Sequence, residues 1–288
     1  MNDKYNNITF HNRRVFIDVG YGCTYGCKYC YVFNDKPTQE LINEEEFISS
    51  LIFIEQNPNF IKGEKGTLIS LSPNTEPFLS LKSSEYVKIV LDKFLKYGNP
   101  IQISTKSSIP NDVLYQIKTN RKHKNQVIFF VSIAIISSVK ILEPFAPNIN
   151  TRCENFLKLK AFDTPSCLYI KPAILQTIKD FDIFALLIQK FMPDYLCIGV
   201  FYKKQKVTFG NWLVHPVHSD YASNGIKNAD IIDFAEKVYL KFQKKVFYSS
   251  ICVVAYINDM LPSSDIWRLT DNPLCVHCRP CNEESKIY

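Results

Sequence analysis

The sequence of 288 residues lacks any long apolar run. No stretch approaches the roughly eighteen uninterrupted apolar residues of a membrane-spanning helix. Its first residues, Met1–Asn7, contain no apolar segment typical of a secretory signal. Internal repeats and low-complexity segments are also missing. These absences predict a cytoplasmic protein that does not cross a membrane.

A strong excess of either charge is missing as well. The net charge is +6, and the two basic clusters, at 121–124 and 203–206, are short. Such a balance permits a polyanionic substrate such as nucleic acid without requiring one, and solvated surface lysines are the simpler interpretation. With 46% hydrophobic residues the chain can bury one large core, or one barrel with a small appendage.

Cysteine, by contrast, is plentiful, with ten residues in the chain. In a reducing compartment, cysteines are metal ligands or buried thiols before they are disulfides. Six of the ten fall into two tight triplets, which are Cys23, Cys27, Cys30 and Cys275, Cys278, Cys281.

The first triplet has the spacing C-x3-C-x2-C and directly follows an apolar, strand-like segment. Three thiolates on a four-iron cluster leave one iron open, and an open iron can chelate a cofactor and pass an electron into it. Zinc sites usually use two cysteine pairs separated by a longer stretch. The spacing therefore favours a [4Fe-4S] cluster over zinc or structural thiols.

Apolar β-branched runs alternate with amphipathic stretches along most of the chain. The predicted strands are Val15–Val19, Thr67–Ser72, Ile101–Thr105, Val127–Ile133, Leu168–Lys171 and Tyr195–Phe201. The predicted helices are Asn43–Gln56, Ser83–Tyr97, Asn111–Lys118, Arg152–Ala161 and Asp180–Phe191. A further helix, Asn228–Lys241, and a strand, Val246–Val253, follow a less regular stretch.

Alternating strands and helices imply parallel crossovers. The predicted fold is therefore α/β, a partial TIM barrel of (β/α)6 type over residues 1–205, with a small C-terminal metal-binding extension over 206–288. In such barrels chemistry occurs at the carboxyl ends of the strands. Cys23, Ser72, Ser104 and Ser132 fall at these ends.

Four blocks of sequence together resemble the radical S-adenosylmethionine (SAM) superfamily, in its spore photoproduct lyase-like, or DNA repair photolyase-like, branch. They are Tyr21–Tyr31 with the cysteines, Ser104-Thr105-Lys106-Ser107, Ser132-Ile133-Ala134 followed by Leu142-Glu143-Pro144, Pro147 and Arg152, and Lys171-Pro172. The resemblance implies that SAM binds the open iron and is reductively cleaved to a 5′-deoxyadenosyl radical. That radical abstracts hydrogen from a substrate, and a reductant such as flavodoxin or ferredoxin supplies the electron.

The same resemblance assigns roles to residues around SAM. A cation should meet the SAM carboxylate, with Lys106 as first choice and Lys171 as the other candidate. Tyr29 would lie against the adenine. Hydrogen bonds to the ribose and the amino group would come from Ser132 and the segment holding Ser72, Asn74 and Glu76, and Ser104 is a further cofactor-binding candidate. Glu76 is equally interpreted as a carboxylate at the barrel rim, and Glu143 with Arg152 as a salt bridge within a loop.

One departure from the family concerns the hydrogen donor. Spore photoproduct lyase has a cysteine near the end of the second barrel strand, where this chain has Ser72-Pro73-Asn74-Thr75. The resemblance therefore supports SAM chemistry more than that enzyme's own reaction. Cys153, Cys167 and Cys197 are predicted to be buried and inert, although Cys167 or Cys197 in the lumen could replace the donor.

The second triplet, C-x2-C-x2-C, is compact enough for an auxiliary iron–sulfur cluster, and zinc held by Cys3His is the rival. A fourth ligand could be Cys252, His277, one of His215 and His218, or the substrate. The pair His215 and His218 is otherwise an ordinary loop feature.

Three functions remain open at this point. The first is radical SAM chemistry on nucleic acid or a nucleotide, which family resemblance and the basic balance favour. The second is radical SAM modification of a peptide or small metabolite, using an auxiliary cluster. The third is a non-catalytic nucleic-acid-binding protein with a zinc tail, which the intact triplet and Lys106 disfavour.

Overall fold

The computed structural model describes residues 5–30, 32, 38–199, 208–209, 212–213 and 227–260. Its centre is an eight-stranded sheet in the order β1-β2-β5-β6-β7-β8-β9-β12. The strands are β1 (Ile8–His11), β2 (Arg14–Ile17), β5 (Leu68–Leu71), β6 (Ile101–Thr105), β7 (Val127–Ser132), β8 (Ser166–Ile170), β9 (Tyr195–Ile198) and β12 (Val246–Phe247). From β2 to β12 all neighbours are parallel, while β1 pairs antiparallel with β2.

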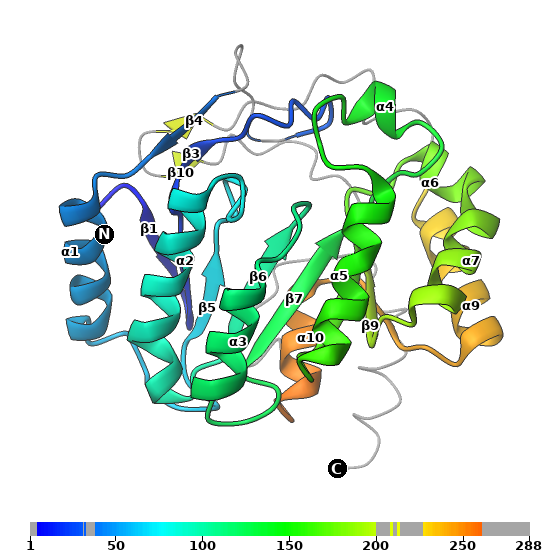
Figure 1. The fold of residues 1–288 in the computed structure, drawn as a ribbon. Helices are drawn as coiled ribbons and strands as arrows, with labels where there is room; N and C mark the ends of the chain where they lie inside the picture. Colours follow the sequence, from blue (N-terminus) through cyan, green and yellow to red (C-terminus); the bar gives the residue numbers. More distant parts are fainter. Residues whose placement is uncertain are drawn as a thin grey trace.

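Helices cover both faces of this sheet (Figure 1). One face carries α1 (Glu44–Gln56), α2 (Leu81–Phe94), α3 (Asn111–Asn120), α5 (Ile149–Ala161), α7 (Phe181–Phe191) and α9 (Asn228–Phe242). The opposite face carries α10 (Ser250–Ile257). Shorter elements are the 3-10 turn Leu95–Tyr97, α4 (Val139–Leu142), α6 (Leu175–Lys179), and the two-stranded ribbons β3 (Gly20–Gly22) with β4 (Gln39–Leu41) and β10 (Thr208–Phe209) with β11 (Trp212–Leu213).

Strand residues alternate between the two layers because successive side chains point to opposite faces. In β7, Phe129 and Val131 join the large core beneath the outer helices, whereas Ile128 and Phe130 join the smaller core beneath α10. Both faces are thus apolar. This explains why the strands read as continuous hydrophobic runs, as is typical of buried parallel sheets.

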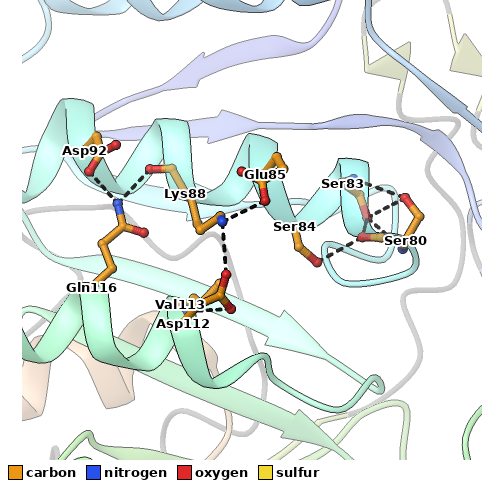
Figure 2. A network of polar contacts seen from close by, with 9 residues as sticks. All are labelled: Ser80, Ser83, Ser84, Glu85, Lys88, Asp92, Asp112, Val113 and Gln116. Atoms are coloured by element: carbon orange, nitrogen blue, oxygen red, sulfur yellow. Dashed lines mark hydrogen bonds and ion pairs between the residues drawn. The ribbon is translucent and has the colours of Figure 1, made fainter.

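The start of α2 and its contact with α3 show how polar groups fix the outer layer (Figure 2). Ser80 caps α2, since its hydroxyl accepts from Ser83 N at 3.1 Å and its own N–H donates to Ser83 Oγ at 2.9 Å. Lys88 Nζ lies 2.7 Å from Glu85 and 3.0 Å from Asp112 on α3. Such exposed pairs contribute little to stability, so the apolar faces of α2 and α3 supply most of it.

Most predicted elements are confirmed. The six predicted strands and all six predicted helices appear within a few residues of their expected bounds. The strand predicted at Val246–Val253 is wrong beyond Phe247, because α10 begins at Ser250. An apolar run that is buried on every side carries no periodicity by which strand and helix can be told apart.

The predicted fold class is confirmed. The sheet is mostly parallel, and β1 and β12 form its two edges over the described ranges, as in a partial rather than a closed barrel. The predicted boundary near residue 205 and the second cysteine triplet lie outside the described residues. In the part of the chain that is described, no helix combines the length and apolar character needed to cross a membrane.

Candidate functional site at the carboxyl ends of the strands

The cysteine loop, Cys23–Cys30, begins directly after β3 at the carboxyl end of the sheet (Figure 1). Gly22 forms a parallel bridge with Thr75, whose hydroxyl donates to Gly22 O at 2.5 Å. Thr75 belongs to the loop after β5. The loops after the first two parallel strands are therefore joined at the point where the cysteines begin.

All three thiols of this loop are free and half-buried. Burial raises the pKa of Cys23 and of Cys27 to about 12, and it also raises the pKa of Cys30. Cys27 and Cys30 are near enough to raise the pKa of Cys23 a little further. In the described ranges, no three His, Cys, Asp or Glu side chains are placed closely enough to hold a metal ion as they stand.

Main-chain and hydroxyl contacts hold the loop from outside. Tyr25 and Ser107 share a hydrogen bond of 2.5 Å between their hydroxyls. Lys28 N donates to Leu142 O at 2.9 Å, and Phe145 N donates to Tyr25 O at 3.3 Å. The segment that follows α4 thus lies against the cysteine loop along several residues.

Gly26 is required where that segment packs. Its φ of +58° lies in the left-handed region. A Cβ at this position would also lie 3.1 Å from the Phe145 ring. Any larger residue would strain the turn between Cys23 and Cys27.

Lys106 lies at the centre of the predicted cofactor residues. Its ammonium donates to Ser132 Oγ at 2.8 Å and lies 5.6 Å from the centre of the Tyr29 ring. Burial acts to lower the pKa of Lys106, but the carboxylate of Glu143 and the thiol of Cys27 more than offset it, so that the pKa is raised. The structure brings Tyr29, Lys106 and Ser132 together beside the cysteines.

Glu76 is buried and accepts hydrogen bonds from residues at the end of the next strand, β6. Its carboxylate accepts from Thr105 Oγ1 and, at 2.9 Å, from Lys106 N. A weaker bond of 3.4 Å comes from Phe78 N. Burial raises the pKa of Glu76, and these donors partly counteract it. Glu76 therefore orients the strand end from which Lys106 projects.

Ser72 and Asn74 occupy the same loop, and Asn74 contacts another residue, Asp18. Asp18, at the end of β2, accepts from Asn74 N at 3.0 Å and from Asn74 Nδ2 at 2.8 Å. Burial raises the pKa of Asp18 to about 7. Ser72 has a left-handed φ of 52°, and its buried hydroxyl has no hydrogen-bond partner among the described residues.

Lys171 and Ser104 lie at or near the carboxyl ends of β8 and β6. Lys171 follows β8 and lies across Gly199, where a Cβ would come within 3.1 Å of its Cδ. Ser104 lies on β6 and is half-buried.

The predicted salt bridge between Glu143 and Arg152 is confirmed, but it is buried rather than exposed. Both side chains have 0% exposure. Tyr29 donates its hydroxyl to the same carboxylate. Glu143 and Arg152 thus belong to the cysteine site rather than to an outer loop.

The remaining thiols are buried, as predicted. Cys153 lies on α5, whereas Cys167 and Cys197 pack with α10 and are 0% exposed. Cys167 and Cys197 thus lie on the face opposite the outer helices, the face that a barrel turns toward its lumen, and α10 covers them there. Cys252, one candidate for the fourth tail ligand, lies in α10. His215, His218, His277, Cys275, Cys278 and Cys281 lie outside the described residues.

Sequence reasoning missed three features of the site. They are the Asp18–Asn74 pair, the bond from Thr105 to Glu76 and the Tyr25–Ser107 bond. An isolated acidic residue at the end of an apolar strand, such as Asp18, is a signal that could have been used.

Comparison with known proteins gives the fold. No family model matches the sequence, and no curated protein does. A mutant spore photoproduct lyase with bound AdoMet and dinucleoside spore photoproduct is 13% identical, with a TM-score of 0.57, covering 82% of this chain and 76% of that one. Streptococcus suis SuiB bound to S-adenosylmethionine is 10% identical, with a TM-score of 0.55, covering 89% of this chain.

The chain is short compared with some of these proteins. The match spans 54% of SuiB and 54% of a spore photoproduct lyase complexed with dinucleoside spore photoproduct. At these identities the likeness shows a shared fold, which is the fold that the sequence blocks predict.

Proposed function

We propose that this chain is a radical SAM enzyme, and that its cluster is held by Cys23, Cys27 and Cys30. The observation that carries the proposal is the placement of this triplet at the carboxyl ends of the parallel strands, beside Lys106, Ser132 and Tyr29. The shared fold with two AdoMet-bound structures supports it.

The donor set suits the proposed group. Thiolates are the ligands that four-iron clusters take, and three of them leave one iron open. The three thiols share one short loop, and Cys27 and Cys30 lie near enough to Cys23 to raise its pKa. When bound, the cluster and SAM would supply reductive cleavage of SAM to a 5′-deoxyadenosyl radical.

The protein's own side chains and backbone would then bind SAM and orient it. The Lys106 ammonium is the cation for the SAM carboxylate, and the backbone at Tyr29 would lie against the adenine. Ser132, Ser104 and the residues of the loop after β5, Ser72, Asn74 and Glu76, are the proposed hydrogen-bonding groups. Lys171 is a second cation for the carboxylate or for the substrate.

Nucleic acid or a nucleotide derivative is the substrate class that we propose first. One structure with this fold contains bound dinucleoside spore photoproduct, and the chain has a mild basic excess. Modification of a peptide or small metabolite is the second candidate, favoured by the additional triplet in the tail. A cytoplasmic location and a flavodoxin or ferredoxin reductant belong to the same proposal.

Anaerobic reconstitution with iron and sulfide tests the function directly. The reconstituted protein should contain about four iron atoms at the first triplet and show the paramagnetic signal of a reduced cluster. Adding SAM should shift that signal, and dithionite should then yield 5′-deoxyadenosine. Absence of both the cluster signal and 5′-deoxyadenosine would contradict the proposal.

Lys106→Ala should weaken SAM binding while leaving the cluster in place. The change removes one charge-assisted hydrogen bond, which is worth roughly 1.5–3 kcal/mol. Calorimetric titration of SAM, together with iron analysis, measures both effects. Unchanged SAM affinity at normal iron content would transfer the role to Lys171, which a Lys171→Ala variant would show.

A triple change of Cys275, Cys278 and Cys281 to Ala should remove metal from the tail and leave the first cluster. The two triplets are disjoint ligand sets, so SAM cleavage without substrate should persist. Metal analysis identifies the tail metal. About four iron atoms in both proteins, with zinc only in the wild type, would exclude an auxiliary cluster and support Cys3His zinc.

A further inference from the structure

The buried carboxylate of Glu143 lies between two elements that are remote in the sequence. One oxygen accepts the Tyr29 hydroxyl, and the other pairs with Arg152 on α5. We infer that Glu143 and Arg152 form a positioning pair that holds Tyr29, and through it the cysteine loop, against the strand ends. The inference rests on the proposed function only for the identity of what the loop binds.

Arg152 is itself fixed in place. Its Nε donates to Pro147 O at 2.8 Å, and its Nη1 donates to Ser132 O at 3.3 Å. Ser132 ends β7, and its hydroxyl accepts from Lys106. The guanidinium therefore ties the segment after α4 to the same strand end that carries a proposed SAM contact.

Tyr29 links this pair to the cysteines. It directly precedes Cys30, whose N–H donates to Cys27 O at 2.9 Å. Tyr29 is 5% exposed and packs with Ala134, Ile135, Leu142 and Ile174. Because the ring is enclosed and the hydroxyl is bonded, Tyr29 cannot shift without moving the Cys27–Cys30 turn.

A buried ion pair is a poor means of adding stability, since its desolvation opposes its attraction. Apolar residues of similar size would stabilise the core at least as well. A buried carboxylate that accepts from both a guanidinium and a tyrosine does, however, fix one orientation of each. The geometry thus favours positioning over simple stabilisation.

The test uses Tyr29→Phe, which removes the hydroxyl alone, and Tyr97→Phe as its matched control. Tyr97 also donates its hydroxyl to a carboxylate, that of Glu55. It is far from the cysteines in the sequence and lies in the turn that precedes β6. In cluster-free protein, the rates of alkylation of Cys27 and Cys30 by iodoacetamide are followed by mass spectrometry. Tyr29→Phe should increase them roughly tenfold, because losing one such bond shifts a local opening equilibrium by about that factor. Tyr97→Phe should leave them unchanged.

Two variants of the pair test whether Arg152 takes part in the positioning. Glu143→Gln keeps an acceptor for Tyr29 but leaves Arg152 as an unpaired buried charge, and should also speed alkylation. The double variant Glu143→Gln with Arg152→Met removes both charges, but it also removes the bonds from Arg152 to Pro147 O and Ser132 O, so alkylation should stay faster than in the wild type. In reconstituted protein, the reduced-cluster spectrum should change in Tyr29→Phe and not in Tyr97→Phe.

Equal alkylation rates in Tyr29→Phe, Tyr97→Phe and the wild type would overturn the inference. A double variant that alkylates at the wild-type rate would overturn it too, because an acceptor for Tyr29 would then position the loop without the ion pair. Failure of the wild type to form a cluster would contradict the proposed function alone, since the alkylation rates require none.

Discussion

Cys27→Ala is expected to abolish formation of 5′-deoxyadenosine from SAM under dithionite. Two thiolates cannot hold a four-iron cluster with its open iron in place. Cys27 is the middle residue of the triplet, and its carbonyl accepts the hydrogen bond from Cys30 N. Iron analysis should therefore show loss of the first cluster together with loss of the product.

A buried thiol elsewhere supplies the control. Cys153→Ala removes a side chain from the core beneath α5 and lowers stability, as large-to-small core changes do. It should keep both the cluster and SAM cleavage. If Cys27→Ala still yields 5′-deoxyadenosine at the wild-type rate, the assignment of the triplet is wrong.

The sequence was sufficient to predict the parallel sheet, because β-branched apolar runs alternated with amphipathic stretches. The strand Ile101–Thr105 was predicted with its observed bounds. The order of residues along the strands was also informative. Lys106 follows β6 and Ser132 ends the neighbouring strand β7. Parallel strands bring their carboxyl ends to one edge, where the structure shows the two side chains in contact.

Two kinds of feature could not be predicted. The predicted strand Val246–Val253 runs into the first turn of α10, because every side chain from Ile251 to Ala255 is buried and no polar face marks the period of the helix. The bonds of Asp18 and Glu76 depend on how loops from different strands meet, and spacing in the sequence does not determine this. Glu143 and Arg152 were predicted to pair, but their burial followed from the packing of α4 and α5 against the cysteine loop.

Asp18 should make the protein less stable as the pH rises from about 4 to 7. Its ordinary pKa is 3.8, and burial raises it to about 7 in the folded chain. Below both values the residue is protonated in the folded and unfolded states alike. Between them the unfolded chain has released its proton while the folded chain keeps it, so the free energy of unfolding falls by up to about 4 kcal/mol. Glu76, whose pKa is also raised, acts in the same direction.

Asp18→Asn should remove most of that decline, so that the wild type and the variant differ most near pH 7. The carbonyl oxygen of the substituted side chain can accept from Asn74 N as the Asp18 carboxylate does. Its new amide group can donate to Asn74 Oδ1, which now lacks a partner in the described structure, once the Asn74 amide turns over. Denaturant unfolding from pH 4 to 8 measures the difference.

Asp163→Asn is the control, because the ion partners of Asp163 lower its pKa below 3.8, so its contribution to stability is lost only in more acidic solution. An Asp18→Asn variant whose stability falls with pH as steeply as that of the wild type would show that Asp18 ionises normally in the folded chain.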